Sequence, residues 1–258
     1  MAVPLVGIVA LASAYELLAL PGDALWHEIF GIDLTAWSPP HVTISLMMAV
    51  VLVGAAAMLV DAHERERVAR PTVPAVLLCG LALNVLSLIG VLEWELPVAL
   101  TAQVAARPIW AYPAVAGILA FASFAVARLL VPARWTATGV ALAFLGIRLA
   151  VTGGLAVTGQ VAPILSLVPL LGAVAFDLAA ARSRSATRSA AAFTAGYTVV
   201  VLPQLALRTD LPALTAADQV IAMGVIFAGS IAIALLAGLR PTPIPHRSSS
   251  ALRPAGTR

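Results

Sequence analysis

Residues 41–60 read HVTISLMMAVVLVGAAAMLV, a run of twenty residues without Asp, Glu, Lys or Arg. A helix of about 20 apolar residues is long enough to cross the hydrocarbon core of a bilayer. Similar runs recur along the 258 residues, and the expected spans are 2–20, 41–60, 72–92, 108–130, 135–157, 161–181, 188–207 and 218–238. The sequence therefore predicts an all-α, polytopic membrane bundle of about eight transmembrane helices within residues 1–238.

The composition argues against a soluble globular domain. Hydrophobic residues make up 61% of the chain and charged residues only 10%, whereas a soluble domain carries about 25% charged residues. The core of a water-soluble protein of this length could not bury so much apolar surface, whereas a lipid bilayer can surround it. We therefore expect the lipid bilayer as a partner and no nucleic acid. Partner membrane subunits and a homo-oligomer remain open.

The loops between the expected spans differ in charge. All 15 basic residues are Arg, and twelve of them fall on one side if the eight spans alternate. These are Arg65, Arg67, Arg70, Arg128, Arg134, Arg182, Arg184, Arg188, Arg240, Arg247, Arg253 and Arg258. The positive-inside rule then places both termini in the cytoplasm. We expect a multi-pass protein of the bacterial inner (plasma) membrane.

The two terminal segments carry their own signals. Residues 1–14 contain an apolar run and the small-residue sequence Ala12-Ser13-Ala14, as signal peptides do, but they lack a positive n-region. We therefore expect them to be retained as part of the first span. Residues 239–258 are rich in Pro, Ser and Arg, which predicts a disordered cytoplasmic tail.

One external segment concentrates side chains that can carry chemistry. Residues 21–41 read PGDALWHEIFGIDLTAWSPPH and follow the first span. Pro21 can begin a short helix in this loop, and Gly31 can end it. Asp23 and His27 are four residues apart and would share one face of that helix.

The end of the same segment supplies a second imidazole. Ser38 is expected to cap the second span, with Pro39 in its first turn, so that His41 lies at the membrane surface. A hairpin between the two helices would bring Asp23, His27 and His41 together. One carboxylate and two imidazoles suffice to hold a metal and leave open positions for water or substrate. On ligand type alone, the metal could be zinc, non-haem iron or copper.

The order of these residues resembles a known copper site. Asp23 is followed by Trp26-His27, and then by Trp37-Ser38-Pro39-Pro40-His41. This segment of about 20 residues is similar to the metal-site segment in the C subunit of particulate methane and ammonia monooxygenases. The resemblance implies that Asp23, His27 and His41 are copper ligands, and that the chain is an oxygenase-type subunit or a non-catalytic relative.

The chain also departs from that family. The family carries a second ligand group, an Asn and two His, on the following helices. Here Asn84 lies in the third span with no His near it, His63 lies on the cytoplasmic side, and His246 lies in the tail. The family also needs partner subunits for oxygenase activity, so the sequence leaves enzymatic activity open.

A simpler interpretation of the segment involves no metal. Trp26, Ile29 and Phe30 would lie among the lipid headgroups as one face of an interfacial helix. Asp23 would then be a solvated loop charge.

Acidic residues near the external surface offer further candidates. Glu16, in the first span, could pair with Arg148 of the fifth span, or turn toward the Asp23 cluster as an additional ligand or as an acceptor for an imidazole N–H. It could also simply reach the membrane interface. Glu93 and Glu95 end the third span at the same depth. They could add carboxylate ligands, but we expect solvated end charges around an interfacial Trp.

At the cytoplasmic side, Asp177 is a second intramembrane charge. Arg182 and Arg184 follow it closely in the sequence, and either could neutralise it in a structural pair.

Three functions remain open on these patterns. The first is a membrane protein with an Asp/His/His metal site, with copper as the preferred metal. The second is a transporter or permease of a small solute or metal ion, for which Arg148 and Asn84 are the polar candidates inside the membrane. The third is a non-catalytic assembly protein of the membrane.

Overall fold

The computed structural model describes residues 2–31, 36–66, 72–95, 107–160, 169–183, 185–209 and 211–237. Within these residues the secondary structure is helical, with no strand. The helices are α1 (Ala2–Phe30), α2 (Pro39–Glu66), α3 (Thr72–Gly90), α4 (Leu92–Glu95), α6 (Ala111–Leu130), α7 (Thr136–Val157), α8 (Leu170–Arg182), α9 (Ala186–Ala206) and α10 (Ala216–Leu236). The predicted all-α fold is confirmed.

Seven of the described helices are long and apolar enough to cross a membrane, namely α1, α2, α3, α6, α7, α9 and α10. They correspond to seven of the eight expected spans. The remaining expected span, 161–181, begins in residues 161–168, which lie outside the described residues. Its described part is α8, a helix of 13 residues. The expected tail at 239–258 also lies outside the described residues.

Contacts between distant residues show which helix ends lie together. Arg208, just beyond α9, donates to the backbone oxygen of Trp94 in α4 at 3.0 Å. At the opposite end, Asp177 near the end of α8 accepts from Thr138 in the first turn of α7 at 2.8 Å. The end of α8 therefore lies beside the start of α7. The expected crossing over 161–181 stays a prediction, because residues 161–168 lie outside the described residues.

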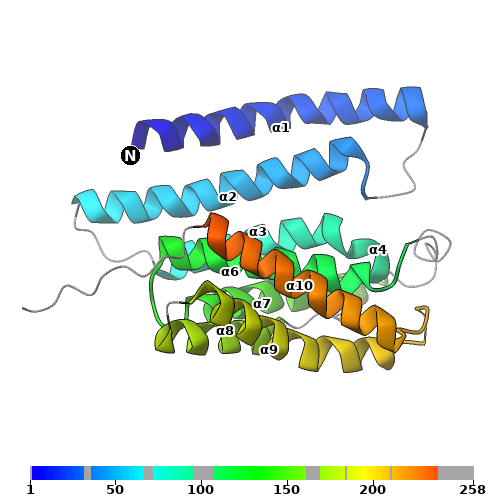
Figure 1. The fold of residues 1–258 in the computed structure, drawn as a ribbon. Helices are drawn as coiled ribbons and strands as arrows, with labels where there is room; N and C mark the ends of the chain where they lie inside the picture. Colours follow the sequence, from blue (N-terminus) through cyan, green and yellow to red (C-terminus); the bar gives the residue numbers. More distant parts are fainter. Residues whose placement is uncertain are drawn as a thin grey trace, which may run out of the picture.

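Helices α1 and α2 form a hairpin along one side of the other helices (Figure 1). Helix α1 packs chiefly against α2, and α2 packs in turn against α3. The two helices approach closely at Gly54, where a Cβ would overlap the side chain of Val9. Most of α1 is otherwise exposed, as expected of a helix that faces lipid.

The first helix differs from the expectation. It runs without interruption from Ala2 to Phe30, and Pro21 lies inside it rather than at the start of a separate short helix. A proline removes one backbone hydrogen bond, and in an apolar setting the chain gains by keeping all the others. Gly31 ends the helix as expected, with a φ of +85° that favours glycine.

The length of α1 determines where its last turns lie. Its 29 residues span about 43 Å at 1.5 Å per residue, whereas the hydrocarbon core is about 30 Å thick. The helix therefore extends beyond the hydrocarbon, and Asp23 and His27 lie in its last two turns. The expected external loop at this point is a helical extension of the first span.

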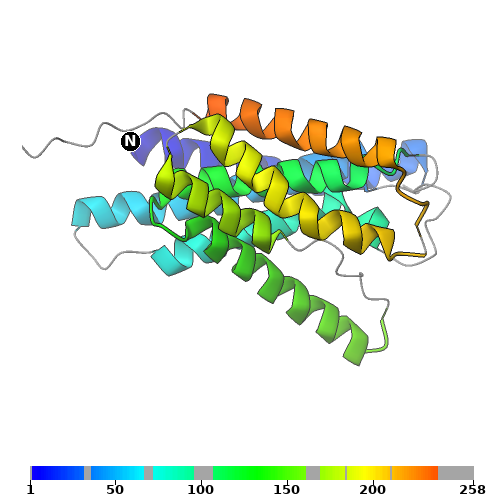
Figure 2. The same ribbon diagram turned by 60° about the horizontal axis from the view of Figure 1, so that its bottom comes forward.

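The other helices form the core of the bundle. An aromatic cluster joins α6, α8 and α9, with ring contacts from Phe121 to Phe176 and Phe193. The Tyr197 hydroxyl, on α9, donates to the backbone oxygen of Pro113 on α6 at 3.1 Å. Viewed from another side, the C-terminal half of α7 projects away from its neighbours (Figure 2), and its side chains there are mostly exposed.

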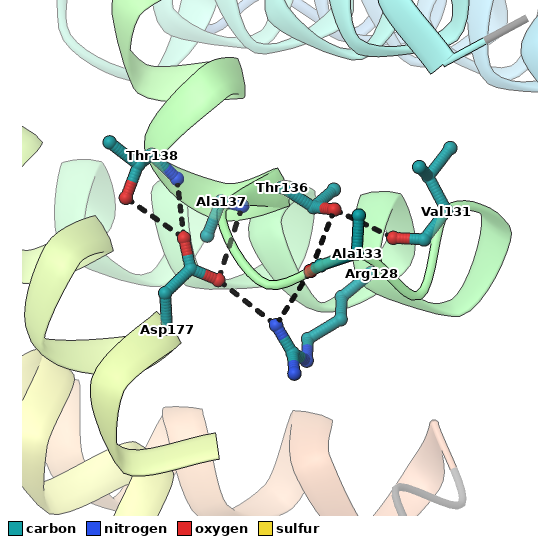
Figure 3. A network of polar contacts seen from close by, with 7 residues as sticks. All are labelled: Arg128, Val131, Ala133, Thr136, Ala137, Thr138 and Asp177. Atoms are coloured by element: carbon teal, nitrogen blue, oxygen red, sulfur yellow. Dashed lines mark hydrogen bonds and ion pairs between the residues drawn. The ribbon is translucent and has the colours of Figure 1, made fainter. Parts of the chain in front are cut away.

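Asp177 is the centre of a buried polar network where α6 ends and α7 begins (Figure 3). Its carboxylate is fully buried and accepts from the backbone N–H and the hydroxyl of Thr138, both at 2.8 Å. Its ion-pair partner is Arg128 of α6, at 3.1 Å. Arg128, and not the expected Arg182, is thus the arginine paired with Asp177 among the described residues, whereas the other expected partner, Arg184, lies outside them. The network ties α6, α7 and α8 together.

We expect Asp177→Ala to lower the free energy of unfolding by about 3 kcal/mol, because removing one partner of a buried ion pair leaves the other without compensation. Denaturant titration of the purified protein in detergent measures this change. Asp218→Ala is the control, since Asp218 closes a surface capping box with Thr215 at the start of α10 and such groups contribute less than about 1 kcal/mol. Equal losses in the two variants would contradict the structural role of Asp177.

Cysteine labelling tests the orientation and the crossing that includes α8. In a Cys79→Ala background, we expect Gln160→Cys, beyond the end of α7, to react with a membrane-impermeant maleimide in intact cells. Arg182→Cys, at the end of α8, should react only after permeabilisation. Labelling of both positions from the same side would contradict a crossing between them.

Candidate metal centre

The end of the α1–α2 hairpin gathers one carboxylate and two imidazoles. Among the described residues, Asp23, His27 and His41 form the group suited to hold a metal ion, with one ligand atom from each lying within 4.8 Å of the others. The His27 Nε2 lies 3.5 Å from the Asp23 Oδ2. The His41 Nε2 lies 3.5 Å from the Asp23 Oδ1. The predicted proximity of these three residues is confirmed.

Each side chain is positioned by helix geometry. Asp23 and His27 are separated by one turn of α1, and His41 is the third residue of α2. The two imidazole rings have centroids 6.0 Å apart and are tilted by 56°. The two His therefore reach the same carboxylate from different helices.

The second nitrogen of His27 is held by the end of its own helix. The His27 Nδ1 lies 3.2 Å from the backbone oxygen of Gly31. With the proton on Nδ1, this contact is a hydrogen bond that leaves Nε2 as a lone-pair donor facing Asp23. Metal-binding His side chains are commonly oriented in this way, since a bond at one ring nitrogen determines the tautomer of the other.

The separations suit a shared metal ion better than direct hydrogen bonds. An N–H···O bond has its heavy atoms 2.7–3.2 Å apart, and both contacts here are 3.5 Å. Metal–nitrogen and metal–oxygen bonds of about 2.0–2.2 Å at a tetrahedral angle place their ligand atoms about 3.4 Å apart. The two distances run to different oxygens of Asp23, and one ligand atom from each residue lies within 4.8 Å of the others, so the rings must close in before all three share one ion of zinc or copper size.

The side chains of the centre are partly exposed on the surface of the protein. The side chains of Asp23, His27 and His41 are 24%, 32% and 35% exposed. A pocket of about 290 Å³ also opens between α1 and α2, and Gly22, Trp26 and Pro40 line it. Each of these three residues directly precedes a candidate ligand in the sequence, so the pocket lies on the helix faces next to those that carry the ligands.

Ser38 does not act as the predicted cap. It stands directly before α2, but its buried hydroxyl has no hydrogen-bond partner. The first two residues of α2, Pro39 and Pro40, have no N–H, which leaves the N–H of His41 as the donor for a capping oxygen, and the Ser38 hydroxyl does not accept from it. The helix start is instead determined by its two prolines.

Glu16 lies apart from the centre and from Arg148. It precedes Asp23 by seven residues in α1, or about 10 Å along the helix axis, and it does not belong to the group that can share an ion. Its Oε1 is buried without a hydrogen-bond partner. The predicted Glu16–Arg148 pair is wrong, because Arg148 pairs with Glu95.

Glu93 and Glu95 are buried rather than solvated. They are 2% and 1% exposed, and each pairs with an arginine, Glu93 with Arg107 and Glu95 with Arg148. The expectation of solvated end charges is therefore wrong. Neither carboxylate belongs to the Asp23 group.

Trp94 lies between the two acidic residues and is fully buried rather than interfacial. It stacks on Tyr112 with ring centroids 5.1 Å apart and meets the edge of Trp37 at 6.1 Å. The Arg107 guanidinium lies 4.6 Å from the Trp37 ring centroid. We name the residues Trp37, Glu93, Trp94 and Arg107 the anchor cluster.

The sequence did not single out Arg107 or Trp37 as parts of a common cluster. The available signal was that acidic, aromatic and basic residues occur together in two loops expected on the external side. Trp37 lies in the first, and the Glu93-Trp94-Glu95 run and Arg107 lie in the second. Charge sign placed them on one side of the membrane, but nothing local indicated that they touch.

Polar groups deeper in the bundle are bonded to the protein itself. The Asn84 side-chain nitrogen donates to the backbone oxygens of Gly80 and Phe144 at 3.0 and 3.3 Å, and Arg148 is neutralised by Glu95. The two residues on which a transport pathway would depend are thus engaged in helix contacts.

The remaining two His lie away from the centre. His63 is near the opposite end of α2, 22 residues from His41 or about 33 Å along the helix. His246 lies outside the described residues.

Comparison with known proteins gave no match: no family model, no curated protein and no solved structure is significantly similar to this chain.

Proposed function

We propose that this protein is a membrane metal-binding protein whose centre is formed by Asp23, His27 and His41 on the external face. The observation that carries the proposal is that three ligand atoms from two helices lie within 4.8 Å of one another. The grouping of the Arg-rich loops at the other end of the bundle supports the external location.

The ligand set favours a transition metal. Imidazole nitrogen suits zinc, copper and iron, whereas magnesium and calcium prefer oxygen ligands. Three protein ligands leave at least one position for water or another molecule, as in catalytic rather than structural zinc sites. The exposure of the side chains is compatible with such an open position.

Copper is the metal that we propose. For a given set of nitrogen and oxygen ligands, Cu²⁺ binds more tightly than the other divalent metals of its row. The resemblance of the segment from Asp23 to His41 to a monooxygenase copper site points to the same metal. The protein would then be an oxygenase-type subunit or a relative that holds copper without catalysis.

Metal analysis tests this function. We expect the full chain, purified in detergent and equilibrated with Cu²⁺, to retain one copper ion, because the three ligands form a single site. His27→Ala and His41→Ala should each lose it, since two remaining ligands hold an exposed ion weakly. His63→Ala is the matched control and should keep the ion. Retention of copper by a His27→Ala/His41→Ala double variant would overturn the proposal.

A further inference from the structure

The start of α2 is bonded to a carboxylate far away in the sequence. The backbone N–H of Ala36 donates to the Glu93 Oε1 across 57 residues. Glu93 is 2% exposed and is held from its other oxygen by Arg107. A buried, charged acceptor makes a stronger hydrogen bond than a neutral one, so Ala36 is attached firmly to α4.

The next residue is held by its side chain. The Trp37 ring meets the Trp94 ring edge-on at 6.1 Å, and the Arg107 guanidinium lies over Trp37 at 4.6 Å from its centroid. Arg107 therefore contacts both Glu93 and Trp37. Ala36 is therefore attached to α4 by a hydrogen bond to Glu93, and Trp37 is attached to α4 by its ring contact with Trp94.

The chain between this attachment and His41 is stiff. Pro39 and Pro40 follow Ser38, and each proline ring restricts its own φ as well as the conformation of the preceding residue. His41 comes directly after them as the third residue of α2. A displacement of Ala36 is therefore passed on to the His41 side chain rather than absorbed by the intervening residues.

The other two candidate ligands come from the other helix of the hairpin. Asp23 and His27 belong to α1, which packs chiefly against α2. On the His41 side, the anchor cluster connects the metal end of the hairpin to the rest of the bundle.

We propose that Glu93 is a positioning residue for the metal centre, because its bond to Ala36 sets the place of His41 relative to Asp23 and His27. This inference rests on the proposed function. Glu93 does not touch the ion, and its effect is on the geometry and affinity of the centre.

Glu95 provides a matched control in the same turn of helix. Like Glu93 it is buried and paired with an arginine, but its partner is Arg148 of α7. Arg148 is 7% exposed and Arg107 is 22% exposed, so removal of the Glu95 carboxylate leaves the more deeply buried arginine without its partner. Any effect that comes merely from lost stability should be at least as large for Glu95.

The experiment is a Cu²⁺ titration of the full chain in detergent, with electron paramagnetic resonance of the bound Cu²⁺. We expect Glu93→Met to weaken binding about tenfold, the lower end of the range for residues that orient ligands, and to change the copper hyperfine splitting. Glu95→Met should leave both within about twofold of the unsubstituted protein. Glu93→Gln should restore most of the affinity, because its amide oxygen still accepts from Ala36.

Equal losses in Glu93→Met and Glu95→Met, or no loss in Glu93→Met, would overturn the inference. So would a Glu93→Gln variant as weak as Glu93→Met, since the charge pair and not the bond to Ala36 would then be decisive. If Glu93→Met does not fold, Glu93→Asp replaces it, because it keeps the charge opposite Arg107 but withdraws the carboxylate from Ala36. Absence of copper binding by the unsubstituted chain is a separate outcome, which removes the proposed function itself.

Discussion

The packing of α1 on α2 is the contact on which the candidate metal centre depends. Helix α1 has little other support from the bundle, and its place is determined where Gly54 lets Val9 approach the α2 backbone. That contact lies about four to five turns from the ligands along α1 and about four turns along α2, and the stiffness of the two helices makes it determine the position of their far ends. It brings Asp23 and His27 beside His41, and no segment of the chain alone could do so.

The buried charges at the same end of the bundle have a geometric role. Buried ion pairs are expensive to desolvate, and apolar residues of similar size often give equal or greater stability. The pairs Glu93–Arg107 and Glu95–Arg148 nevertheless lie side by side on α4. The first of them reaches the start of α2 through Ala36, and the second joins α4 to α7. Their value is to hold helix ends in one arrangement, where apolar packing alone would tolerate sliding.

The errors of the sequence-based reasoning share one physical cause. In the structure, Glu95 pairs with Arg148 and Asp177 pairs with Arg128, each across two helices. The partner predicted for Asp177 was a near neighbour in the sequence. The partner predicted for Arg148 was chosen only because it lies at a similar depth in the membrane. Helical periodicity and membrane depth are local properties, whereas the identity of a neighbouring helix depends on how the whole bundle packs. The prediction that Pro21 begins a separate helix was wrong for a related reason. Whether a proline is tolerated inside α1 depends on the apolar surroundings of that helix and not on the proline itself.

The sequence by itself determined the spans, the sorting of charged loops to two ends, and the three residues of the candidate centre. It could do so because a bilayer demands apolar runs of a given length, and because alternating spans place Asp23, His27 and His41 on one side. Only the tertiary structure decided that α1 is continuous, that Glu93 and Glu95 are buried, and that Glu93 holds the start of α2. These features arise from contacts between helices distant in the chain, and such contacts depend on the shapes of packed surfaces.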